Sequence, residues 1–177
     1  MVIASGPTID KLIGEGKLAP GSRADIVRSG VGVGVRTGFP RVDISSGEAV
    51  RKAVLAARSV AYSQGPSGVY VAALFKRWGI DDEIKPRLKI GKVGEPVGDI
   101  IVRGEADLGF QQISELLPVK GIDVLGPLPP DIQEITIFAA GRHVHAMSIE
   151  PAAAWLKFLQ GPEAAVVLKS KGMIPGT

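Results

Sequence analysis

Residues 59–75, SVAYSQGPSGVYVAALF, decide the fold class because a strand pattern passes into a helix pattern through a short loop. The apolar run at the start predicts a buried strand, and Pro66 opens a run with helical spacing. Strand–loop–helix units of this kind build α/β sheets. The loop places Ser63 and Ser67 near the helix N-terminus, where free N–H groups and the helix dipole favour an anion. The stretch therefore predicts an anion site that includes the Gly68 N–H, or simply a helix that Ser67 caps.

The rest of the chain repeats this alternation of strand and helix patterns, which predicts an α/β fold. The expected strands are 2–5, 24–36, 59–63, 106–112, 122–130 and 135–141. The expected helices are 7–15, 45–57, 66–79, 80–88, 95–106, 113–118, 150–160 and 162–171. Ser45 and Glu48 have the spacing of a capping box for the second helix. In the strand 24–36, valine alternates with glycine, so one face is branched and the other is bare.

Three segments follow from the order of these elements. Residues 37–128 form a self-contained lobe, whereas 1–36 and 129–177 are expected to form parts of a second lobe. Two lobes joined by two crossovers predict a clamshell, with the ligand at the carboxyl ends of the strands.

The composition excludes several classes of function. The 177 residues carry a net charge of +3 with scattered Lys and Arg, which argues against a nucleic-acid partner. There is no cysteine, which excludes disulfides and thiol chemistry, and the pair His143 and His145 has no third metal ligand nearby. No apolar run is long enough for a membrane span, and the chain shows no signal-peptide pattern. We therefore expect neither a metal nor a cofactor.

Two further segments supply candidate ligand contacts. GEPVG at 94–98 is a second helix start, whose alternative interpretation is a routine turn. Gln111 and Gln112 end an apolar strand, where their amides either orient a ligand or form a polar strand end. Glu115, Glu95 and Asp99 are the candidate acid–base groups.

Several segments together resemble the periplasmic molybdate-binding protein family, the type II solute-binding component of ABC transporters. They are DISSGEAVRKAVLAARSVAYS (43–63), PSGVY (66–70), ADLGFQQISELLPVKGIDVLGPLPPDIQ (106–133), TIFAAG (136–141) and GPEAAVVLKSKGM (161–173). The resemblance runs from about residue 2 to the C-terminus, as in a member that lacks the first strands of one lobe. It implies a type II periplasmic-binding-protein-like clamshell with one lobe complete.

The resemblance also implies site residues. The family holds its oxyanion with serine hydroxyls and backbone N–H groups, without metal or counter-charge. Its two N–H donors fall on Ser67 and, because Pro96 cannot donate, on Val97. A family tyrosine falls on Gln112, which favours a larger or more polar ligand than molybdate. The ligand-binding prediction comprises Ser63, Ser67, Gly68, Val97, Gln111 and Gln112.

The expected function is binding of a small anion, an oxyanion or small polycarboxylate, as the periplasmic solute-binding component of an ABC importer. The alternative is a cofactor-independent isomerase that resembles aconitate isomerase, with Glu115 as the base. A third interpretation is a non-binding remnant of the same fold. The expected partners are the anionic ligand and the membrane subunit of the transporter. Strand edges that are expected to be exposed at 2–5 and 135–140 also favour a homodimer.

Overall fold

The computed structural model describes residues 1–176, which divide into two compact units. Unit 1 comprises Met1–Ser29 and Ile135–Thr177, and unit 2 comprises Gly30–Glu134. Strand β2 (Ala24–Arg36) contributes to both units. Residues 30–36 and 129–134, which the sequence had assigned to the other lobe, belong to unit 2.

Unit 2 is built on a mixed sheet with the strand order β6-β2-β5-β3-β4. Its strands besides β2 are β3 (Val60–Tyr62), β4 (Leu88–Ile90), β5 (Leu108–Gln112) and β6 (Ile122–Pro127). β3, β4 and β5 are parallel, whereas β2 runs antiparallel to β5 and β6. The three parallel strands therefore end at one edge of the sheet. The sequence pattern did not predict β4, because three residues are too few to establish an alternation.

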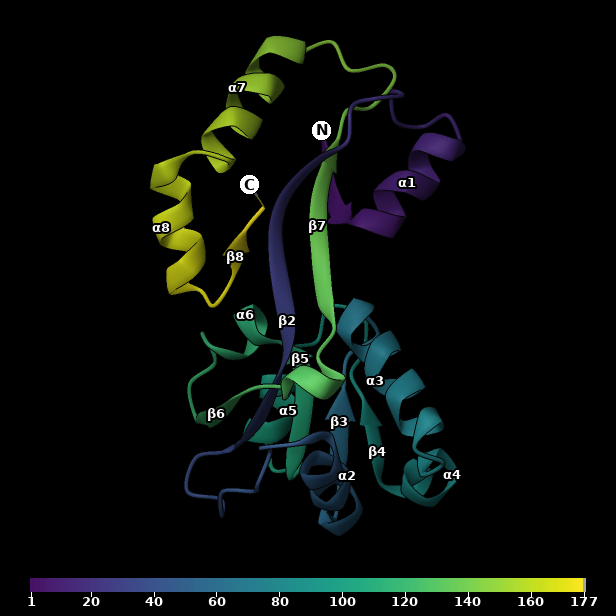
Figure 1. Cartoon of the computed structure of the whole chain (residues 1–177), viewed down its shortest axis with the longest axis vertical. Helices are drawn as coiled ribbons and strands as arrows, with labels where there is room; N and C mark the ends of the chain where they lie inside the picture. Colours follow the sequence, from purple (N-terminus) through teal and green to yellow (C-terminus); the bar gives the residue numbers. More distant parts are fainter. Residues whose placement is uncertain (177) are drawn as a thin grey trace. The chain divides into compact units, whose positions relative to one another are not determined.

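Helices cover both faces of this sheet (Figure 1). They are α2 (Gly47–Ala56), α3 (Pro66–Arg77), α4 (Asp81–Ile84), α5 (Val97–Val102) and α6 (Ile113–Leu116), with 3-10 turns at Lys85–Arg87 and Pro130–Ile132. α2, α3 and α4 pack on one face, and α5 and α6 pack on the other. Unit 2 is thus a three-layer α/β structure, as the alternation of patterns predicted.

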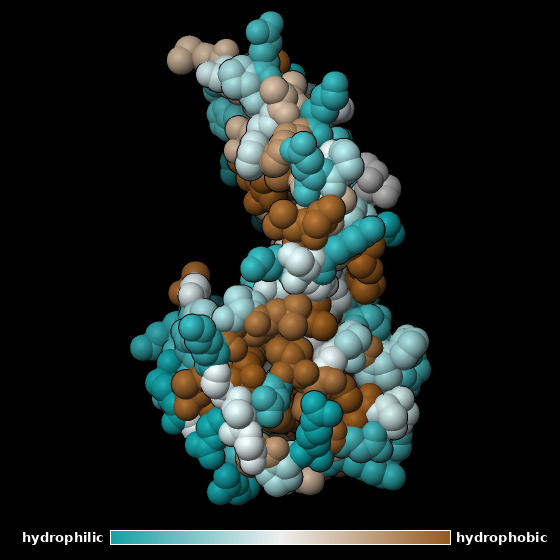
Figure 2. Space-filling view, turned by 90° about the vertical axis from the view of Figure 1, so that its left-hand side faces the viewer, coloured by the Kyte–Doolittle hydropathy of each residue, from teal (hydrophilic) through white to brown (hydrophobic). Residues whose placement is uncertain are grey.

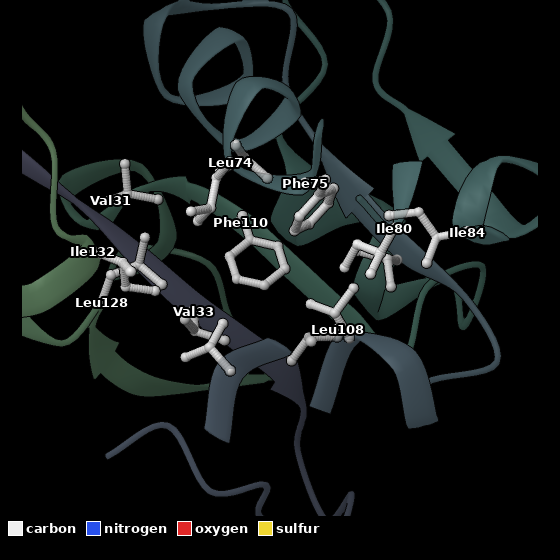
Figure 3. Close-up of a cluster of buried hydrophobic side chains, with 14 of the residues drawn as sticks. Val31, Val33, Leu74, Phe75, Ile80, Ile84, Leu108, Phe110, Leu128 and Ile132 are labelled. Atoms are coloured by element: carbon white, nitrogen blue, oxygen red, sulfur yellow. The ribbon is translucent and has the colours of Figure 1, made fainter. Parts of the chain in front are cut away.

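The main core of unit 2 lies between the sheet and the layer of α2, α3 and α4 (Figure 3). Val31 and Val33 of β2 point into it, which confirms that the branched face of this strand is buried. Phe110 of β5 meets Phe75 of α3 edge-to-face, with the ring centroids 5.8 Å apart. Gly32, on the bare face of β2, leaves room for Ile113 of α6, which would lie 3.1 Å from a Cβ at that position.

Two helix starts differ from the sequence prediction. The N-cap of α2 is Ser46, whose Oγ accepts a hydrogen bond from the Ala49 N–H at 3.2 Å, so the predicted capping box of Ser45 and Glu48 is wrong by one residue. α5 begins at Val97, so Glu95 lies outside the helix.

Unit 1 has a smaller sheet with the order β1-β7-β2, and β8 also pairs with β2. Its further elements are β1 (Val2–Ser5), β7 (Ile135–Gly141), β8 (Ile174–Pro175), α1 (Gly6–Gly14), α7 (Ile149–Leu159) and α8 (Pro162–Ser170). α1 covers one face, and α7 and α8 cover the other. β1 is antiparallel to β7, and β7 lies between β1 and β2, so the prediction of an exposed edge at 135–140 is wrong.

Apolar side chains also reach the surface. Figure 2 shows brown, apolar areas between hydrophilic ones on the face that it presents. In unit 1, Trp155 and Phe158 of α7 are exposed and stacked, with ring centroids 5.4 Å apart. No helix within residues 1–176 is long and apolar enough to cross a membrane.

Candidate functional site

The predicted site residues gather where the parallel strands β3, β4 and β5 end. We call residues 63–68, 91–97 and 111–115, which follow or complete these strand ends, the ligand edge. Its loops are bonded to one another: the Gln64 side-chain amide donates to the Gly91 carbonyl at 3.0 Å, and the Gly91 N–H donates to the Tyr62 carbonyl at 3.2 Å. The sequence prediction did not include Gln64, although it lies in the same loop as Ser63.

A pair of serine hydroxyls marks the start of α3. The Oγ atoms of Ser63 and Ser67 are 3.3 Å apart, and either can be the donor. Ser67 is only 1% exposed. The N-cap of α3 is Gly65, so Ser67 lies inside the first turn. The alternative interpretation, in which Ser67 caps its own helix, is therefore wrong. First-turn N–H groups, which include those of Ser67 and Gly68, have no intrahelical acceptor.

Gly68 fixes the distance between the helix and the preceding strand. A Cβ at this position would lie 1.6 Å from the Ser63 carbonyl oxygen and 2.5 Å from the Ser63 carbonyl carbon. No side chain fits there, because both neighbouring atoms belong to the backbone. The first turn of α3 is thereby held against Ser63, which brings the two hydroxyls together.

The second predicted N–H donor already has a partner in this structure. The Val97 N–H donates to the Oε1 of Gln111 at 2.8 Å, and Gln111 is buried. Close packing supports this contact, because a Cβ on Gly109 would lie 2.6 Å from both Val97 and Ile101. A ligand would reach the Val97 N–H only by displacing the Gln111 amide oxygen.

Glu115 is the ionisable side chain of the ligand edge whose pKa is raised. Protein packed around the carboxyl removes part of its hydration and raises the pKa of Glu115, although the residue as a whole is exposed. A hydrogen bond from the Gln111 side chain lowers the same pKa to a smaller extent. Glu95 lies in the same edge, where a bond from the Lys92 N–H and then one from Arg103 lower its pKa. Of these two carboxylates, Glu115 has the raised pKa and is therefore the stronger proton acceptor.

Gln112 lies on the other side of β5 from Gln111. Successive side chains of a strand point to opposite faces, so Gln112 is on the same side as Phe110 and α3. It is 2% exposed and begins α6. The predicted residues thus lie at the ends of the neighbouring strands β3 and β5 and of the loop after β4, with Ser67, Gly68 and Gln112 on the side of α3 and Val97 and Gln111 on the side of α5.

The predicted ligand donors, which are the side chains of Ser63, Ser67, Gln111 and Gln112 and the N–H groups of Gly68 and Val97, are neutral. Hydroxyl, amide and backbone N–H groups bind an anion by hydrogen bonds and helix-dipole charge, without a competing cation. Within residues 1–176, no group of three His, Cys, Asp or Glu side chains could hold a metal ion. A groove of 440 Å³ lies elsewhere in unit 2, lined by Val42, Asp43, Ser46, Glu48, Ala49, Lys52, Ala53 and Ala56. None of the predicted ligand residues lines it.

Comparison with protein families gives a match over almost the whole chain. A family model described as "Bacterial extracellular solute-binding protein" matches residues 1–174. The chain is also 38% identical to an aconitate isomerase of Pseudomonas sp. over 176 aligned residues. The alignment covers 99% of this chain and 67% of that protein. It is 26% identical over 110 residues to the molybdate-binding protein ModA of Escherichia coli, which is 60% of this chain but only 41% of ModA.

Solved structures agree on the fold. The periplasmic molybdate-binding protein of Azotobacter vinelandii superposes with a TM-score of 0.75 at 20% identity, over 97% of this chain and 75% of that one. The arrangement is therefore that of the type II periplasmic binding proteins, as the resemblance in the sequence implied.

Proposed function

Because the chain belongs to the bacterial extracellular solute-binding proteins, we propose that the ligand edge of unit 2 binds a small anionic solute. The observation that carries the proposal is the pair of hydroxyls of Ser63 and Ser67, 3.3 Å apart at the N-terminus of a 12-residue helix. Two hydroxyls and the first-turn N–H groups form a cradle of donors for one anionic group. Gly68 supports this use, because a larger residue would separate the donors.

The ligand class follows from the size and polarity of the same edge. Gln111 and Gln112 add amide groups at the end of β5, the strand next to β3, so donors are spread over two neighbouring strand ends. A small polycarboxylate uses such an extended set of donors more fully than a compact oxyanion does. The 38% identity to an aconitate isomerase, a higher value than for the molybdate-binding relative, supports the same choice.

An isomerase of an unsaturated tricarboxylate is the second candidate, and the position of Glu115 favours it. In such a reaction a carboxylate takes a proton from a methylene carbon, the double bond shifts, and the proton returns at the other end of the shifted bond. The raised pKa of Glu115 suits this base. No cofactor is needed, because the reaction has no net oxidation.

As a solute-binding component, the protein would deliver its ligand to the membrane subunit of an ABC importer in the periplasm. Family membership supports this role. A homodimer through the outer edge of β1, which ends the strand order of unit 1, is a further proposal for its assembly.

A thermal-shift panel tests the proposed function. Molybdate, tungstate, sulfate, phosphate, citrate, cis-aconitate and trans-aconitate are added to the whole chain, and the unfolding temperature is measured. A ligand at a hundred times its dissociation constant adds about 2.7 kcal/mol, or roughly 5–10 °C for a chain of this size. We expect the largest shift with a polycarboxylate. If none of these anions shifts the unfolding temperature, the proposal is refuted.

The Ser67→Ala variant assigns the site. A hydrogen bond to a charged group contributes about 1.5–3 kcal/mol, so this variant is expected to weaken binding by about tenfold to a hundredfold. Ser45→Ala is the matched control, because Ser45 is exposed and lies outside the ligand edge. NMR of cis-aconitate incubated with the protein then separates the two candidate functions. A binding protein leaves the cis-aconitate unchanged, whereas an isomerase converts it to trans-aconitate. If the protein is an isomerase, the Glu115→Gln variant is expected to lose this conversion.

A further inference from the structure

The segment between β6 and β7 is bonded along its length to the rest of unit 2. We call residues 128–133 the strap. The Leu128 N–H donates to the Val31 carbonyl at 2.9 Å, and the Asp131 carboxylate accepts a hydrogen bond from the Gly47 N–H, also at 2.9 Å. Leu128 is 2% exposed and belongs to the main core. The strap is therefore fixed both to β2 and to the start of α2.

The side chain of Gln133, at the end of the strap, bonds to β2 as a neighbouring strand would. Its Oε1 accepts hydrogen bonds from the Val31 and Glu134 N–H groups, each at 2.9 Å. Its Nε2 donates to the Val31 carbonyl at 3.1 Å and to the Leu128 carbonyl at 3.2 Å. Both ends of the amide thus use their full hydrogen-bonding capacity. A Cβ on Gly30 would lie 3.1 Å from this side chain, so the glycine favours the close approach of Gln133 to β2.

Tyr70 joins the strap to the helix that begins at the cradle of donors. Its hydroxyl donates to the Ile132 carbonyl at 2.6 Å. Tyr70 lies on α3 three residues after Ser67, which is about one helical turn. α3 is thereby held at two points, by the close approach of Gly68 to Ser63 at its start and by Tyr70 one turn later.

We infer that Tyr70 is a positioning residue that couples the cradle at Ser63 and Ser67 to the strap. An anion bound in the cradle pulls on the first turn of α3, and the hydroxyl of Tyr70 passes a displacement of that helix to Ile132. Gln133, the next residue, is bonded to both backbone groups of its partner on β2, so the displacement continues into that strand. The strap ends where the chain passes from unit 2 to β7, so the coupling reaches the boundary of the unit. The response to an anion rests on the proposed function, whereas the positioning of α3 by the strap does not.

Hydrogen exchange of the ligand-free protein tests the positioning. Tyr70→Phe keeps the ring but removes the hydroxyl, so the strap loses its bond to α3. The backbone amides of Val31 and Gly47, which bond to the strap, are then expected to exchange about threefold to tenfold faster with solvent. Tyr62→Phe is the matched control, because it makes the same chemical change in the same core and leaves the bond to the strap intact. The Val97 amide, on the other face of the sheet, measures any general loss of stability. The inference is refuted if Val31 and Gly47 exchange as in wild type, or if Val97 accelerates equally.

A double-mutant cycle tests the coupling to a ligand. The dissociation constant of citrate is measured by calorimetry for wild type, Tyr70→Phe, Gln133→Met and the double variant. Each single change is expected to weaken citrate binding about threefold, and the double variant about as much as one single change, because both interrupt the same series of contacts. Effects that multiply to about ninefold, or single variants that bind citrate as tightly as wild type, would overturn the coupling. If wild type does not bind citrate, the proposed polycarboxylate ligand is refuted, while the exchange experiment still decides the positioning role of Tyr70.

Discussion

Alanine at position 68 provides a severe test of the geometry at the start of α3. The added Cβ would lie 1.6 Å from the Ser63 carbonyl oxygen, although real Cβ contacts are essentially never shorter than 3.0 Å. The obstacle is backbone, so no side-chain rotation can relieve it, and the first turn of α3 must move by more than an ångström. Overpacking of this kind costs about 3 kcal/mol, which lowers the unfolding temperature by about 6–12 °C in a chain of this size.

The matched control is three residues away. A Cβ on Gly65 would meet only the Ser63 Oγ, at 3.6 Å, and the backbone of Gly65 is extended with φ at −78°. Gly65→Ala is therefore expected to cost about 1 kcal/mol or less, mainly because alanine is a poorer N-cap than glycine. Thermal unfolding followed by circular dichroism compares the two variants. If Gly68→Ala were as stable as Gly65→Ala, the close approach of α3 to Ser63 would be wrong.

Two further predictions concern unit 2. Ser46→Ala should lower the free energy of unfolding by about 1 kcal/mol in urea denaturation, whereas Ser45→Ala should change it by less than about 0.5 kcal/mol; equal losses would contradict the assignment of Ser46 as the cap. The Arg58 side chain lowers the pKa of Asp107 below its ordinary 3.8, so the ionised carboxylate stabilises the fold above that pH. This contribution is lost as the pH falls through the lower folded value. The difference in unfolding free energy between wild type and Asp107→Asn should thus be constant above about pH 5 and shrink below about pH 4. A difference that does not change with pH would count against the ion pair.

Much of the fold could be predicted from the sequence because its signals are local. The alternation of valine and glycine in 24–36 correctly indicated a strand with one branched and one bare face. Pro66 correctly marked the start of α3. β4 was missed because its three residues follow a 3-10 turn and leave no pattern of their own. The cap was assigned to Ser45 because Ser45 and Glu48 have the spacing of a capping box, and only the backbone geometry places the cap on Ser46.

The site was less predictable because its contacts join distant residues. Ser63 and Ser67 are close in sequence, so their proximity could be anticipated from a helix start. Val97 and Gln111 lie on different elements, and no spacing rule indicates that one bonds to the other. The sequence therefore treated them as two independent ligand contacts, whereas the structure pairs them. Their roles toward a ligand remain predictions.

The division into units has a consequence for how the protein is made. Unit 2 is a continuous segment, Gly30–Glu134, whereas unit 1 joins Met1–Ser29 to the residues from Ile135 onward. During synthesis on a ribosome, all strands of unit 2 are available before β7 exists, so its core can close first. β1 leaves the ribosome before every strand of unit 2, yet its partner in residues 1–176 is β7, which is synthesised after the whole of unit 2. β1 therefore finds its partner strand only after the whole of unit 2 has been synthesised, and during that interval it is a part of the chain that a chaperone would usefully shield.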